Sequence, residues 1–195
     1  MSTSPVVPAT NQNPLGRAVP PGWEADEIRF GIVDYDKFGN DIEFFYMRPI
    51  KVMQGNDIVG FIDDLRRSGL PLTSTPETPL DLHVPKKCWM VIGLSRHKWQ
   101  FRATGDAITT KQKKDQSYAN LVHVFPNGTT VPGGGQMQDN CQLVYFACVD
   151  PPQGMTGTLP YEDGFNMHID LIQANGKRLP LVIDPDIRFP GGAGS

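Results

Sequence analysis

The side chains best suited to acid–base chemistry or metal binding in this sequence are four histidines. No two of them stand two or four residues apart, and no cysteine lies close enough to one of them to form a local zinc unit. They are His83, His97, His123 and His168. A site assembled from separate strands stays open, because His168 and Asp170 fall on the same side of a predicted strand. A hydrolase or isomerase built on this pair is therefore one hypothesis.

An acidic stretch places Asp34, Asp36 and Gly39 at the first, third and sixth positions of a calcium-binding loop. The fifth and twelfth positions, where oxygen ligands belong, hold Phe38 and Phe45 instead. We therefore expect a hairpin with an acidic turn here. The sequence predicts no metal site and no cofactor.

The glycine-rich segment Pro132–Gln136 could suggest a phosphate-binding loop. It precedes no helix and lacks the lysine and hydroxyl residue of a P-loop, so nothing fixes its backbone N–H groups toward a phosphate. A flexible loop is the better interpretation. No serine lies in a nucleophile elbow and no cysteine in a nucleophile motif, so the sequence predicts no catalytic residue.

A basic run lies between Arg96 and Lys114, with six positive charges against one carboxylate, that of Asp106. Strand alternation places Trp99 and Phe101 opposite these charges, which favours a solvated strand face over a nucleic-acid track. An acidic block at residues 23–64 holds ten acidic residues against four basic ones. The two blocks are compatible with head-to-tail association of copies of the chain.

A small-ligand or carbohydrate pocket at one end of the fold is a further hypothesis. It would use the loops around residue 23, residues 133–136 and residue 161, together with the polar face of the strand that carries His168. The predicted ligand-binding residues are Trp23, Gln136, Tyr161, His168 and Asp170.

The element that would position these groups is a hairpin over residues 165–184. Phe165, Met167, Ile169 and Leu171 alternate with polar residues, as in a half-buried strand. Asn-Gly at 175–176 favours a two-residue type I′ turn. Pro180 predicts that the returning strand lies at a sheet edge or bulges there.

Further strands are expected along most of the chain. A second hairpin runs from residue 28 to residue 47, with a turn at residues 36–40. The best helix candidate covers residues 56–67. Strand-like runs follow at Cys88–Leu94, Trp99–Ile108, Tyr118–Phe125 and Gln142–Asp150. This pattern predicts a mainly β fold, an antiparallel sandwich or jelly-roll-like barrel, with one short helix and extended termini.

Composition divides the chain into a proline-rich arm (residues 1–22), one β-sandwich domain (23–188) and a glycine-rich tail (189–195). The arm carries scattered apolar residues, and its prolines lower the entropy lost when it is ordered. We expect it to dock onto a neighbouring subunit.

The odd number of cysteines, three, and their place in or beside apolar segments predict buried, reduced thiols. They are Cys88, Cys141 and Cys148. With no secretory signal at the start and no membrane segment, the expected compartment is the cytoplasm. The net charge of −3 gives no general reason to expect nucleic acid or an anionic membrane.

The absence of a compact catalytic motif favours a non-enzymatic β-sandwich module. It would act by binding or self-assembly, as a homo-oligomer or filament subunit. The alternatives are a virion or particle subunit, the ligand-binding protein described above, and the enzyme built on His168 and Asp170.

Overall fold

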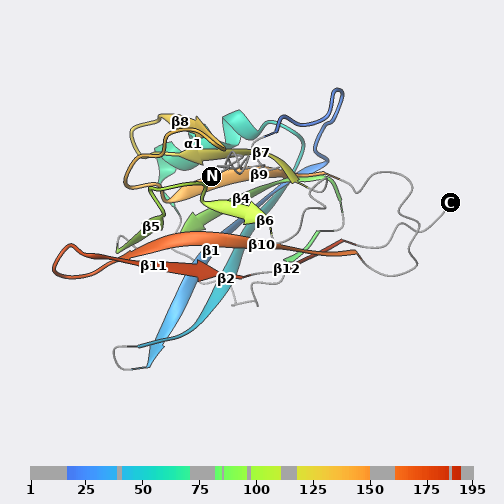
Figure 1. Cartoon of the computed structure of the whole chain (residues 1–195). Helices are drawn as coiled ribbons and strands as arrows, with labels where there is room; N and C mark the ends of the chain where they lie inside the picture. Colours follow the sequence, from blue (N-terminus) through green and yellow to red (C-terminus); the bar gives the residue numbers. More distant parts are fainter. Residues whose placement is uncertain are drawn as a thin grey trace, which may run out of the picture.

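Two β-sheets pack face to face in a computed structural model of the chain, and one helix lies on the outer face of the first sheet (Figure 1). The structure describes residues 17–38, 41–70, 82–84, 86–95, 98–110, 118–149, 161–184 and 186–189. The predicted fold class, mainly β with one short helix, is confirmed. Most of the N-terminal arm and of the C-terminal tail lies outside the described residues, so docking of the arm stays a prediction.

The first sheet has the strand order β2-β1-β4-β9-β7-β8. Its strands are β1 (Glu27–Phe38), β2 (Asp41–Gln54), β4 (Cys88–Leu94), β7 (Tyr118–Val124), β8 (Thr130–Pro132) and β9 (Leu143–Cys148).

The second sheet is organised around one long strand, β10 (Tyr161–Ile172). β10 pairs antiparallel with β11 at one end and with β12 at the other, and the two short strands β5 and β6 also pair with it. β3 pairs with β12. The bounds are β3 (Leu82–His83), β5 (Trp99–Phe101), β6 (Ile108–Thr110), β11 (Arg178–Ile183) and β12 (Asp186–Phe189).

Two apolar cores lie on the two faces of the first sheet. One fills the space between the sheets and includes Phe146 of β9 and Phe165 of β10, whose rings meet edge to face at 5.7 Å between centroids. The other lies under the helix and includes Phe30 and Phe61. Because β4 is covered on both faces, all seven of its residues are buried. This explains why its sequence is almost continuously apolar.

The helix α1 (Ile58–Ser68) begins where the Asp57 carboxylate accepts a hydrogen bond from the N–H of Gly60 and ends before Gly69. The prediction of a helix here is confirmed. β4 is the first strand of this sheet after α1, with β3 between them in the chain, and it pairs with β1 in parallel, not antiparallel as expected. A connection long enough to contain a helix can return the chain in the same direction, which a tight turn cannot do.

The prediction of one strand from Trp99 to Ile108 was wrong, because the chain leaves the sheet between β5 and β6. Gly105 has a φ of +82° in this break. Such a conformation suits a turn and interrupts a ladder. Both halves still pair with β10, and residues 102–107 form a connection beside it.

The β10–β11 hairpin is confirmed, but its predicted type I′ turn is not. Gly176 has a φ of +76°, whereas Asn175 has no positive φ. The Gly176 N–H donates to the Gln173 carbonyl, and the Gln173 N–H donates to the Lys177 carbonyl. This is a turn closed by a glycine bulge, in which only the glycine needs the left-handed conformation.

β11 lies at the edge of the second sheet, as Pro180 predicts. Two apolar side chains of this strand are exposed, Leu179 at 43% and Val182 at 54%.

The β1–β2 hairpin is confirmed, but its loop is shorter than predicted. Asp36, Lys37 and Phe38 continue β1 and do not form the turn. Of the two irregularities in the β1–β2 pairing, the one nearer the turn lies between Asp36 and Lys37. Residues 39 and 40 lie outside the described residues. A bulge lets both strands continue past the irregularity.

The three cysteines are buried and free, as predicted. Burial raises the pKa of the Cys141 thiol to about 12, so that thiol stays protonated and inert. In the described part of the chain, no helix is long and apolar enough to cross a membrane.

Candidate functional site

An open pocket of about 450 Å³ lies beside the polar side of β10. One wall comes from β10, a second from the β5–β6 connection and β6, and a third from the connection between β8 and β9. We call it the β10 pocket. Its lining residues are Arg102, Thr104, Gly105, Asp106, Thr109, Gly134, Gly135 and His168.

His168 is the titratable imidazole of this pocket. Its backbone is fixed on both sides, because its N–H donates to the Ala107 carbonyl at 2.8 Å and its carbonyl accepts from the Arg102 N–H at 2.9 Å. Its ring Nε2 lies 2.8 Å from the Thr109 hydroxyl oxygen. Burial lowers the pKa of His168, and the Arg102 guanidinium lowers it further, while Asp106 acts in the opposite direction. The ring is therefore neutral at pH 7, as a proton acceptor must be.

Arg102 pairs with a buried carboxylate next to the pocket. Its Nε lies 3.6 Å from Asp170 Oδ1, which is an ion pair too long to be a hydrogen bond, and its Nη2 donates to the Leu181 carbonyl at 3.2 Å. The Asp170 side chain is only 8% exposed. The guanidinium is thus held at the pocket wall by the polar face of β10 and by β11.

Asp106 connects two of the pocket walls, because its carboxylate accepts a hydrogen bond from the Gly134 N–H at 2.7 Å. The neighbouring glycines bind within the fold as well: the Gly133 N–H donates to the Leu121 carbonyl and the Gly135 N–H to the Pro132 carbonyl. All three amide donors of this turn are therefore engaged. The sequence-based interpretation that this segment is no phosphate loop agrees with this geometry.

His123 lies behind the pocket and links the wall formed by the β5–β6 connection to β8, the strand that leads into the glycine turn. It is fully buried in β7. Its Nε2 accepts a hydrogen bond from the Ala107 N–H at 3.1 Å, so the proton is on Nδ1, which donates to the Val131 carbonyl at 3.0 Å. Burial lowers the pKa of His123, although the Val131 carbonyl and Asp106 both act to raise it. A neutral ring satisfies both bonds, whereas a proton on Nε2 would face the Ala107 N–H.

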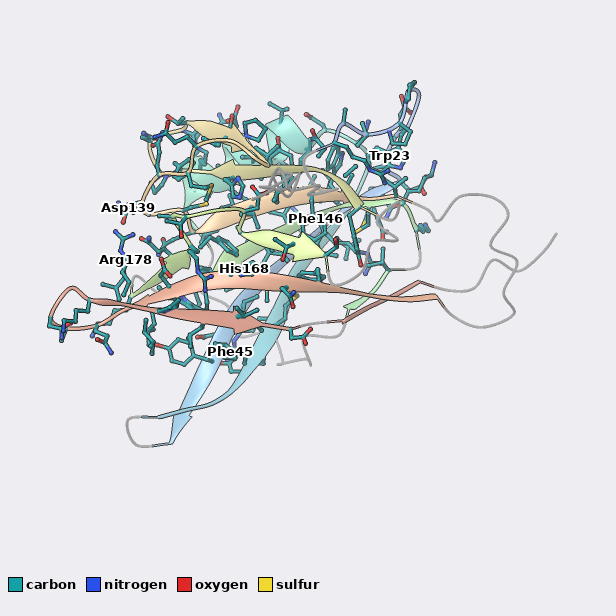
Figure 2. The ribbon with its side chains drawn as sticks, in the orientation of Figure 1. Trp23, Phe45, Asp139, Phe146, His168 and Arg178 are labelled. Atoms are coloured by element: carbon teal, nitrogen blue, oxygen red, sulfur yellow. The ribbon has the colours of Figure 1, made fainter. Side chains whose placement is uncertain are left out.

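The predicted binding residues do not all come together. Trp23 packs edge to face on Trp89 at 5.1 Å, in the core under α1, and Figure 2 shows it far from His168. Its assignment to one pocket with His168 was wrong, because the segment before β1 lies on the outer face of the first sheet.

Of the other four, His168 lines the β10 pocket and Asp170 pairs with a residue that lines it. Gln136 is exposed and follows the two glycines that line the pocket, but it does not line the pocket itself. The backbone of Tyr161 pairs with Phe189, while its side chain lies outside the described part.

Arg102, Asp106 and Thr109 were missed. Arg102 was interpreted as part of a solvated strand face, and the other two fell inside or just after the supposed single strand. The Gly105-Asp106 pair is a turn signal that could have divided that strand and revealed the connection. Arg96 and the lysines at 111–114 lie outside the described residues.

A second open pocket, of about 230 Å³, lies beside the end of α1 and is mostly apolar. We call it the α1 pocket. Its lining residues are Leu65, Arg66, Gly69, Leu70, Val124, Phe125, Pro126, Gln142 and Leu143. Arg66 is its one ionisable group and already pairs with Asp63 at 3.3 Å. The α1 pocket therefore lacks the combination of base, acid and hydroxyl found at the β10 pocket.

Among the described residues, no group of three or more histidine, cysteine, aspartate or glutamate side chains could hold a metal ion.

Comparison with known protein families places the chain in a class of predicted nucleotide synthetases. Residues 61–192 match the sequence model of the pNTSase1 family, described as a predicted novel nucleotide synthetase. The match covers more than half of the chain and includes every residue that lines the β10 pocket, so the chain belongs to this family. The chain matches none of the curated protein sequences.

This finding overturns the prediction of a non-enzymatic, self-assembling structural module, because the family implies an enzyme. That prediction rested on the absence of a compact catalytic motif. The polar groups of the β10 pocket come instead from three separate stretches of chain, which no short motif can contain.

Proposed function

We propose that this chain is an enzyme that synthesises a nucleotide, with the β10 pocket as its active site. One observation carries the proposal. A neutral imidazole, a hydroxyl, a carboxylate and a guanidinium line the same open pocket, and this pocket lies inside the family-matched region. These are the groups that a bond-forming reaction between polar substrates needs for proton transfer and charge stabilisation.

His168 is the group suited to accept the proton of an attacking hydroxyl or amine. Its lowered pKa keeps the ring unprotonated, and the bond between Nε2 and Thr109 orients it. Positioned general acid–base catalysis contributes roughly 10²–10⁴-fold to a rate. Arg102, held by Asp170 and the Leu181 carbonyl, supplies fixed positive charge at the same wall.

The test is a product search followed by one substitution. The full chain is incubated with Mg²⁺, the four ribonucleoside triphosphates and candidate acceptors, and new nucleotides, phosphate and pyrophosphate are measured. His168→Gln can still reach Thr109 but cannot accept the proton, so we expect product formation to fall by about 10²–10⁴-fold. Asp64→Asn, at an exposed position of α1, is the control and keeps full activity.

Two results would contradict the proposal. One is a complete absence of nucleotide turnover across these substrates. The other is a His168→Gln variant that is folded and as active as the unmodified chain.

We also propose that the enzyme works in the cytoplasm. The three buried, reduced cysteines support this compartment, because oxidising compartments favour disulfides. Trapping the thiols in intact cells of the source and finding them oxidised would contradict it.

A further inference from the structure

The β10 pocket has few donors for an anion and several acceptors for hydroxyl groups. The amides of its glycine turn, which a phosphate would need, donate instead to Leu121, Asp106 and Pro132 within the fold. Among the described residues the one helix is α1, which lies on the outer face of the first sheet, so no helix N-terminus, the other common phosphate site, contributes to the described walls of the pocket.

The charges of the described lining residues also disfavour an anionic ligand. Arg102 is the one cation among them, and it is paired with Asp170. His168 is neutral, and Asp106 brings a negative charge to the wall formed by the β5–β6 connection. Among the described lining residues, with Asp170 included, carboxylates outnumber guanidinium groups, which disfavours a polyanion against these walls.

The same groups can form hydrogen bonds with the hydroxyl groups of a sugar or with the polar edge of a nucleobase. A carboxylate has about four acceptor positions, so Asp106 can receive a ligand hydroxyl while it holds the Gly134 N–H. Carboxylates bind ribose hydroxyls in this manner in dinucleotide-binding folds. Thr104, Thr109 and His168 add further groups that accept or donate a hydrogen bond.

We propose that the β10 pocket binds the nucleoside end of the substrate, with Asp106 accepting from its hydroxyl groups, and that the phosphates lie outside the pocket. This inference rests on the proposed function, because it assigns an orientation to the nucleotide in that site. Asp106 is then a specificity-determining residue for the ribose.

The experiment compares three kinds of probe on the full chain by calorimetry, in EDTA so that no cation bridges carboxylates and phosphates. The probes are the four ribonucleosides, their 5′-triphosphates and inorganic triphosphate. At least one nucleoside is expected to bind and to compete with its triphosphate. Inorganic triphosphate is expected not to displace that nucleoside.

Asp106→Asn separates the two kinds of probe, because it should weaken the binding of nucleosides and not that of inorganic triphosphate. The amide oxygen of asparagine can still accept from the Gly134 N–H, so the fold is kept while the charge is lost. We expect nucleoside affinity to fall about tenfold, and affinity for inorganic triphosphate to stay the same or rise. Asp64→Asn, an exposed carboxylate on α1, is the matched control and changes neither.

The two ideas fail in different ways. If a nucleoside triphosphate binds but inorganic triphosphate displaces it and no nucleoside competes, the orientation is wrong and the proposed function stands. A nucleoside affinity unchanged in Asp106→Asn also overturns the orientation alone. If neither nucleosides nor nucleotides bind, both proposals fail.

Discussion

The β10 pocket and the α1 pocket differ in the elements that build them. The α1 pocket is formed by the end of one helix and the strands beneath it, and its walls are the apolar side chains that hold these elements together. The walls of the β10 pocket include two connections, fixed by hydrogen bonds from His123 and Asp106. Apolar packing thus shapes the α1 pocket. The β10 pocket keeps polar groups exposed because hydrogen bonds, of which the one from the Ala107 N–H to His123 is buried, hold its loops in place.

The largest expected effect comes from removing the guanidinium of the β10 pocket. Arg102→Met leaves the buried Asp170 carboxylate without its cation, so we expect a loss of about 3 kcal/mol in the free energy of unfolding. Urea unfolding followed by fluorescence measures it.

Arg178→Met is the control for that change, since the Arg178–Asp139 pair is exposed. Surface pairs contribute little, so no measurable destabilisation is expected there. Equal losses in the two variants would show that the β10 pocket does not depend on its buried ion pair.

A smaller effect is expected from the α1 pocket. Leu70 is partly buried against the core under α1, so Leu70→Ala should lower the free energy of unfolding by about 1–2 kcal/mol, less than for a fully buried leucine. Nucleotide binding and turnover should not change. If the variant kept normal stability but lost turnover, the active site would lie near α1 and not at the β10 pocket.

The smallest effect concerns the histidine behind the β10 pocket. Burial lowers the pKa of His123 from its ordinary value of 6.5. Below pH 6.5 the unfolded chain binds a proton that folded His123 does not, so its contribution to stability is complete above pH 6.5 and is lost as the pH falls toward the lowered value. For one histidine the slope is at most about 1.4 kcal/mol per pH unit.

Urea unfolding at pH 7.5 and pH 5.5 measures this dependence. His168 shifts in the same direction, so a folded His123→Gln variant should lose part of the slope and not all of it. An unchanged slope would show that burial does not lower the pKa of His123 in the folded chain.

The sequence predicts the strands that are apolar by local pattern, and the structure confirms them at β4 and β10. It fails where the outcome depends on distant pairing. Thr109 contacts His168, 59 residues away, because β6 pairs with β10. Asp106 contacts Gly134, 28 residues away, in the turn that follows β8, which pairs with β7. No spacing within a short window encodes such contacts.

Local conformational choices were a second source of error. Asn-Gly is compatible with more than one hairpin turn, and the bulged form needs a positive φ at the glycine alone. The His168–Asp170 face was found because strand alternation is local. Arg102 was missed because its role depends on Asp170, which lies on another strand.

Pro180 has a consequence for how this protein behaves at high concentration. An edge strand with exposed Leu179 and Val182 offers a template on which a strand of another molecule could add and begin an aggregate. Proline has no N–H, and in an edge strand its nitrogen faces away from the paired neighbour. The outer row of donors along β11 is therefore interrupted near its middle, and a strand arriving there finds no continuous ladder to join.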